Sequence, residues 1–177
     1  MIVKIEDVMS LPEFMNMDEK QVQKKLDALE LLIRKYTNNN FQNRHIRFSA
    51  SSLGNRIFGY HPFIRVGDTI QISESQVNDG LYVVTEIGDD KDFIRVDKDL
   101  FPVDHNLVTK IEYPVDIQQG IIKLLQWEVE SINRIGIKSE TLSRHSVTYF
   151  DQDKNNQVMG FPVSLLGFLE TYKKARF

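Results

Sequence analysis

The stretch from Asn78 to Ile87 reads NDGLYVVTEI, and this turn followed by a strand-like run decides the fold class. Asn-Asp-Gly is a strong turn signal because asparagine and glycine tolerate positive φ. The residues after it are rich in β-branched and aromatic side chains, which favour a strand. Comparable short runs lie on both sides, at Ile46–Phe48, Asp68–Ser73, Phe93–Val96 and Leu107–Tyr113.

These five runs, joined by short turns such as Gly88-Asp89-Asp90, predict a small antiparallel β-barrel over residues 44–113. Closure of such a sheet removes the exposed edges that a short strand otherwise presents.

Helical periodicity precedes this β region. Apolar residues from Val22 to Tyr36 recur at spacings of three and four, which predicts an amphipathic helix from about Asp18 to Thr37. Asp18 is placed to cap its first turn, with Gln21 at the capping-box position.

Two more helices are predicted after the β region. Pro114 to about Ile135 has a helix-starting proline and an apolar face, and Gly136 is a stop signal. A third helix is predicted from about Pro162, on a stripe formed by Val163, Leu166, Leu169 and Tyr172.

We therefore expect an α+β fold made of two domains. A small helical bundle of three or more helices, residues 1–43 and 114–177, is interrupted by an inserted five-stranded antiparallel β-barrel-like subdomain, residues 44–113. No helix with one apolar stripe can bury that stripe alone, so the helices are expected to pack together.

Composition excludes several classes of protein. The formal net charge is −3, so there is no overall attraction to DNA, and the absence of cysteine excludes disulfides, thiolate nucleophiles and cysteine-bound metals. No apolar run approaches the roughly 18 residues of a membrane span. We expect a soluble protein made in the cytoplasm, with no membrane contact.

Candidate sites for chemistry fail at required positions, so we expect no enzyme, no catalytic or metal-binding residues and no cofactor. The four histidines are far apart, and the acidic clusters Asp89–Asp92 and Asp97–Asp99 lie at expected strand ends that face water. Asp151–Asn155 begins like a calcium loop, but Asn156 and Pro162 replace the required glycine and glutamate. An acid dyad from Asp89, Asp92 or Asp97 is the one enzymatic alternative.

Two segments are candidates for interaction. The chain ends in a basic, aromatic segment, Tyr172–Phe177, which could equally complement the dipole of the last helix. The connection Ile137–Phe161 is far longer than usual between helices, and Val147–Phe150 within it has strand character. Such a strand can add to a neighbour's sheet; folding back on its own body is an equal alternative.

Four segments carry a resemblance to a known family. They are YPVDI at Tyr113–Ile117, GIKSET at Gly136–Thr141, SVTY at Ser146–Tyr149 and YKKARF at Tyr172–Phe177. Together they resemble the head–tail connector (adaptor, or head completion) proteins of long-tailed bacteriophages and prophages. The resemblance covers about residues 1–43 and 114–177, whereas the shortest members join the first two helices by a brief loop.

This resemblance implies a structural virion protein at the neck, docked on the portal protein and extending the DNA channel. It implies a twelve-fold homo-oligomeric ring in the virion, monomeric or weakly associating in isolation, and a further neck partner (a stopper or tail-completion protein). DNA only passes through the channel. The implied portal contacts are Tyr172, Lys173, Lys174, Arg176 and Phe177. The implied subunit or neck contacts are Ser146, Val147, Thr148, Tyr149 and Phe150.

A binding module is the alternative function. In that hypothesis the β region is an SH3-like barrel that grips a peptide or another ligand, and its aromatic residues line the groove. These residues are equally suited to a core. They are Phe58, Tyr60, Phe63 and Tyr82.

Overall fold

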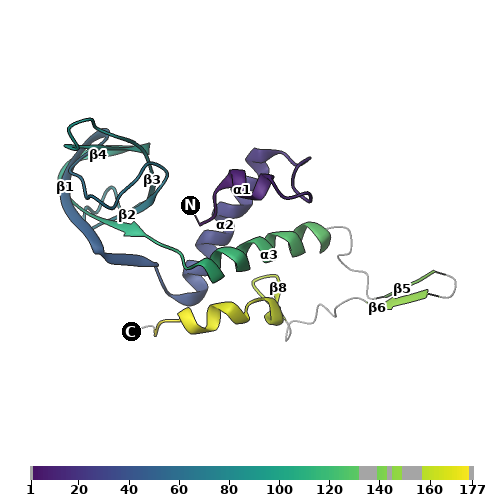
Figure 1. Ribbon diagram of the computed structural model, residues 1–177. Coiled ribbons are helices and arrows are strands. Elements are labelled where there is room, and N and C mark those ends of the chain that lie inside the picture. Colours follow the sequence, from purple (N-terminus) through teal and green to yellow (C-terminus); the bar gives the residue numbers. More distant parts are fainter. Residues whose placement is uncertain (1, 132–138, 143–144, 149–156, 176–177) are drawn as a thin grey trace. The chain divides into compact units, whose positions relative to one another are not determined.

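The computed structural model describes residues 2–131, 139–142, 145–148 and 157–175, which form an α+β fold (Figure 1). The chain divides into two compact units. We call Asn39–Tyr113 the β unit, and Ile2–Asn38 with Pro114–Phe177 the helical unit. In the described ranges, every helix is too short or too polar to serve as a transmembrane span. The roles of the two units as inserted subdomain and connector domain stay predictions.

The described part of the β unit contains four antiparallel strands in the order β1-β4-β2-β3. β4 pairs with β1 along most of its length, with β2 near its end and with β3 near its start. The prediction of five strands is wrong, because two of the expected strands are the two ends of β4. The strands are β1 (Gln42–Phe58), β2 (Thr69–Ser73), β3 (Gly80–Ile87) and β4 (Ile94–Ile111).

Pro102 explains why one long strand looked like two. Proline has no N–H for the strand ladder, so it normally interrupts a strand pattern. In the structure, Leu100 pairs with Gly54 of β1, Val103 pairs with Ser52, and a register shift separates these pairs. The proline thus lies at an irregularity, where sheets tolerate it. A four-stranded sheet results, and the expected five-stranded barrel is not observed among the described residues.

The core of the β unit follows the predicted alternation. Ile70 and Ile72 of β2 are fully buried, whereas Gln71 between them is partly exposed. Residues from all four strands join them, and burial of each large aliphatic side chain stabilises the fold by about 1.5–3 kcal/mol. The fully buried members are Ile57, Ile64, Ile70, Ile72, Ile94 and Val108.

Three buried polar side chains lie beside this core. Ser52, Asn78 and Asn106 are 4%, 1% and 0% exposed. The Asn78 amide Nδ2 lies 3.1 Å from Ser52 Oγ and 3.2 Å from Asn106 Oδ1. The same Nδ2 donates to the carbonyl oxygen of Phe101 at 2.9 Å, and Asn78 Oδ1 accepts the Phe101 backbone N–H at 2.8 Å. Asn78, expected only in a turn, therefore ties the β2–β3 connection to the middle of β4.

We predict that Asn78→Ala destabilises the β unit. The change leaves several buried partners unpaired, and each costs about 1–3 kcal/mol, so the free energy of unfolding should fall by about 3 kcal/mol. Urea unfolding followed by far-UV circular dichroism measures this. Exposed Asn55→Ala is the matched control and should change it by less than about 0.5 kcal/mol. Equal stability of the two variants would contradict the structural role of the network.

The helical unit is built from two longer α-helices and several short elements in the described ranges. Its helices are α1 (Ile5–Met9), α2 (Glu19–Thr37) and α3 (Val115–Ser131), followed by the 3₁₀ segments η3 (Val163–Leu165) and η4 (Gly167–Tyr172). Two small hairpins complete it: β5 (Ser139–Leu142) with β6 (His145–Thr148), and β7 (Gln157–Val158) with β8 (Phe161–Pro162).

The first predicted helix is confirmed as α2. Asp18 is its N-cap, and its carboxylate accepts the backbone N–H of Gln21 at 3.2 Å. Asn38 ends the helix in the left-handed conformation with φ 49°. The predicted apolar stripe is buried at Val22, Leu26, Leu29 and Ile33, whereas its last member, Tyr36, is half-buried.

The third predicted helix is instead two 3₁₀ segments. Its hydrogen bonds run from residue i+3 to residue i, as from Leu166 N to Val163 O and from Leu169 N to Leu166 O. The apolar stripe explains the difference, because a strict three-residue spacing matches the three residues per turn of a 3₁₀-helix. An α-helix would spread the same side chains around its axis. A bundle of three or more long helices was expected. Among the described residues, the structure has two α-helices of substantial length, α2 and α3.

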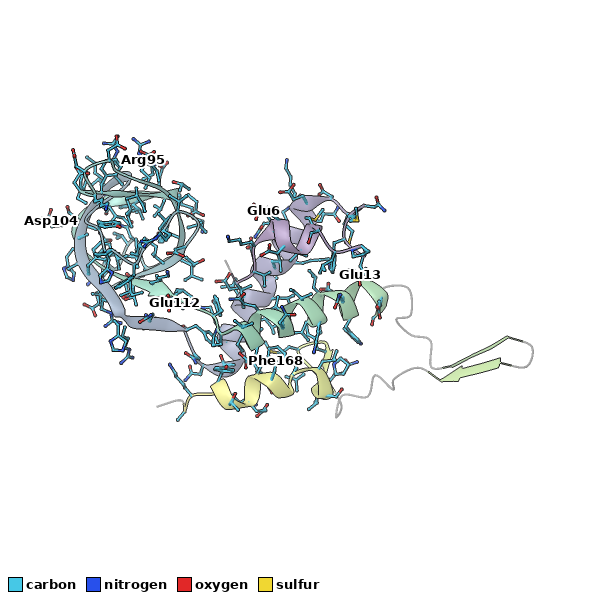
Figure 2. All side chains as sticks on the ribbon, viewed as in Figure 1. Glu6, Glu13, Arg95, Asp104, Glu112 and Phe168 are labelled. Atoms are coloured by element: carbon cyan, nitrogen blue, oxygen red, sulfur yellow. The ribbon has the colours of Figure 1, made fainter. Side chains whose placement is uncertain are left out.

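Gly120 allows α3 and the C-terminal segment to approach closely. A Cβ atom at Gly120 would lie 2.3 Å from the Phe168 ring, too close for any real contact. Figure 2 shows Phe168 on the C-terminal segment beside α3. The missing side chain therefore makes room for the aromatic ring, which accounts for a glycine inside a helix.

We predict that Gly120→Ala lowers the free energy of unfolding of the helical unit by about 1–3 kcal/mol, because overpacking outweighs the helix propensity of alanine. Trp127, the one tryptophan in the sequence, lies on α3 and reports unfolding by fluorescence. Gly167→Ala is the control, because nothing lies within 4 Å of a Cβ at that position. A Gly120→Ala variant that is more stable than the parent would contradict this packing.

Candidate interaction surfaces

The C-terminal segment is fastened to α2 by its backbone. The Lys174 N–H donates to the Thr37 carbonyl oxygen at 2.8 Å. The Asn38 side chain donates to the Ala175 carbonyl oxygen at 2.9 Å. Both acceptor and donor on α2 lie at its C-terminal end, where helix carbonyls lack partners within the helix. The chain therefore leaves η4 along a defined path.

Side chains reinforce this attachment. Lys173 Nζ donates to Glu170 Oε1 at 2.7 Å and to the Tyr36 hydroxyl at 2.9 Å. The Tyr36 hydroxyl in turn donates to Glu170 Oε1 at 3.0 Å. Tyr172 donates its phenolic proton to the Asp116 carboxylate at 2.8 Å, which joins η4 to the first turn of α3.

These contacts shift the pKa values of Glu170, Lys173 and Tyr172. Hydrogen bonds from Lys173 and Tyr36 hold the pKa of Glu170 below its ordinary value of 4.5. The hydrogen bond with Glu170 raises the pKa of Lys173. The hydrogen bond to Asp116 raises the pKa of Tyr172, because ionised phenol could no longer donate.

The expected portal contacts therefore fall into three groups. Tyr172 and Lys173 make contacts within the chain, whereas the Lys174 side chain is exposed. Arg176 and Phe177 lie outside the described residues.

Three of the five expected subunit or neck contacts fall on the β5–β6 hairpin. Ser146, Val147 and Thr148 belong to β6, while Tyr149 and Phe150 lie outside the described residues. Among the described strands, β5 and β6 pair only with each other, so each has one edge with no strand partner.

An apolar pocket of about 390 Å³ lies between α2, α3 and the β7–β8 hairpin. Trp127 and Phe161 form one wall, with ring centroids 5.5 Å apart. Lys25 and Glu128 form an ion pair at the same pocket. The volume is in the range of sites that hold a small ligand or an inserted side chain.

The only sequence signal for this pocket was the single tryptophan, Trp127. Its apolar lining is completed by Ala28, Leu29, Leu32 and Met159.

Among the described residues, two of the side chains considered for chemistry have partners in the sheet, whereas Asp151–Asn155 lie outside the described residues. Asp97 accepts the Val83 backbone N–H at 2.8 Å, which is a structural role in the sheet. His105 Nδ1 lies 2.8 Å from Ser49 Oγ on the adjacent strand. In the described part of the chain, no three histidine or acidic side chains are placed to hold a metal ion.

The aromatic residues of the alternative groove differ in exposure. Tyr60 and Tyr82 pack against the core of the β unit. Phe58 and Phe63 are exposed by 44% and 64%. Two of the four therefore present an aromatic surface to solvent.

No protein-family model matches the chain, and no curated protein was found to be similar to it.

We predict that attachment of the C-terminal segment weakens in acid. Because the folded-state pKa of Glu170 is depressed, its contribution is present above the ordinary pKa of 4.5 and is lost as the pH falls below it. Hydrogen exchange of the Lys174 amide, which is bonded to Thr37, measures the attachment. Its protection should fall between about pH 5 and pH 3.

Glu170→Gln should remove this pH dependence and leave the amide less protected throughout. Glu130→Gln, at an exposed position of α3, is the matched control and should keep the parent's profile. An unchanged profile in Glu170→Gln would contradict the role of this carboxylate.

Proposed function

We propose that this chain is a structural subunit of the head–tail neck of a long-tailed bacteriophage, and not an enzyme. Copies form a twelve-fold ring on the portal protein, and the ring extends the channel through which DNA passes. The next neck protein, a stopper or tail-completion protein, binds the ring. The proposed location is the virion neck, after synthesis in the host cytoplasm, without cofactor or membrane.

The observation that carries this proposal is the β5–β6 hairpin, which lies in the segment with the most specific family resemblance. Each strand has four residues, and an isolated two-stranded hairpin is marginally stable in water. The unpaired edges supply backbone donors and acceptors to a neighbouring chain. A hairpin of this kind gains stability by contact with another subunit or with the neck partner.

The C-terminal segment supports the proposal independently. Its attachment to Thr37 and Asn38 holds the path of the backbone up to Ala175. Exposed Lys174 therefore has a defined position on the helical unit, and we assign it to the portal contact. The contacts of Tyr172 and Lys173 within the chain position this surface.

A second candidate function is the SH3-like binding module. Exposed Phe58 and Phe63 favour it, because aromatic side chains at the surface are common anchors in protein recognition. In this hypothesis the two residues bind a ligand, while assembly at the neck does not require them.

The test is binding to the portal protein encoded in the same genome. We predict that the parent chain joins purified portal rings, as measured by co-sedimentation and electron microscopy. Lys174→Glu should weaken binding about tenfold, which corresponds to about 1.4 kcal/mol. Lys123→Glu, an equally charged change at an exposed position of α3, is the control and should leave binding unchanged.

A parent chain that never joins the portal would contradict the proposed function. The binding-module hypothesis predicts that a double variant, Phe58→Ser with Phe63→Ser, still binds the portal. Loss of portal binding in this double variant would contradict that hypothesis.

A further inference from the structure

Three large apolar side chains of the β unit are exposed next to its buried polar network. Leu53, Val77 and Phe101 are exposed by 58%, 54% and 66%. Two of them are direct neighbours of network residues in the sequence. Leu53 follows Ser52, and Val77 precedes Asn78. We call Leu53, Val77 and Phe101 the apolar patch.

The network brings the three backbones of the patch together. Ser52 Oγ donates to the Phe101 carbonyl oxygen at 2.9 Å. Asn78 bonds both the N–H and the carbonyl oxygen of Phe101, and also lies within 3.1 Å of Ser52 Oγ. The buried side chains of Ser52 and Asn78 therefore hydrogen-bond the backbone of the patch and fix its position. Binding to such a surface costs little conformational entropy.

Acidic residues border the apolar patch. Asp99 precedes Phe101 by two positions and Asp104 follows it by three, while Asp79 follows Val77 by two. All three are exposed. Figure 2 shows Asp104 at the outside of the β unit. A partner for this surface therefore combines an apolar side chain with basic residues.

The outer face of α2 has this composition. Leu31 is 62% exposed, although the apolar stripe of the helix is buried on the opposite side. Lys20, Lys24, Asp27 and Lys35 share its face and are all exposed. Together with Leu31 they recur at spacings of four, three, four and four residues. The face carries three lysines against one aspartate around an exposed leucine. We call these five residues the basic stripe.

We propose that the apolar patch of one copy binds the basic stripe of a second copy. Leu31 contacts Phe101, while Lys24 and Lys35 face Asp99 and Asp104. The two surfaces differ, so the contact is heterologous, and contacts of this type build rings or open filaments. The biological setting of this contact rests on the proposed ring, whereas its test needs no portal protein.

The absence of cysteine allows a direct test by cross-linking. Three full-length variants each carry one cysteine: Leu31→Cys, Phe101→Cys and Phe63→Cys. Phe63 is the matched control because it is 64% exposed in the same unit, against 66% for Phe101. Equimolar mixtures are treated with a short bismaleimide at high protein concentration. Since each chain has one thiol, every product joins two copies.

The mixture of Leu31→Cys and Phe101→Cys should form the mixed dimer at least about tenfold faster than Leu31→Cys with Phe63→Cys, because docking raises the local concentration of the thiols. Equal rates would overturn the proposal. Val77→Cys replaces Phe101→Cys if circular dichroism shows that the latter is unfolded.

Reversing the charges on the two surfaces distinguishes a specific interface from nonspecific apolar association. Adding Lys24→Glu and Lys35→Glu to the Leu31→Cys chain should slow the reaction to the control rate. Adding Asp99→Lys and Asp104→Lys to the Phe101→Cys chain should then restore it. Failure to restore the rate overturns the assigned charge pairing. Loss of portal binding with cross-linking intact contradicts the neck function alone.

Discussion

The missing side chain at Gly120 is the constraint on which the helical unit depends. It lets the Phe168 ring lie against α3, where a single methyl group would not fit. That contact sets the position of η4, and from there Tyr172 reaches Asp116 and Lys173 reaches Tyr36. The placement of Tyr172 and Lys173 thus depends on one glycine.

The β unit depends on a different kind of constraint. The middle of β4, around Pro102, departs from regular pairing with β1, and other hydrogen bonds hold it. Asn78, Ser52 and Asn106 supply them from beneath the surface. The same bonds leave Phe101 and its apolar neighbours facing outward in defined positions. An irregular strand and an exposed apolar patch therefore have one origin.

Local signals in the sequence predicted local structure well. The α2 boundaries follow from Asp18 and Asn38, whose effects reach only a few residues. Sequence reasoning missed α1, which has five residues and no periodic stripe, and it assigned the strict three-residue stripe before Tyr172 to an α-helix. The role of Asn78 was hidden because its partners are 23 to 28 positions away. Of the expected contact sites, Tyr172 bonds Asp116 and Lys173 bonds Tyr36, partners that are 56 and 137 positions away and that no spacing pattern indicates.

A cryo-electron microscopy map of the assembled neck tests the central claim most directly. The account predicts a ring of this chain on the portal, with Lys174 against the portal surface and Leu31 of each copy beside Phe101 of the next. A neck whose ring is built from a different protein, with this chain absent or bound as an isolated copy, would contradict it.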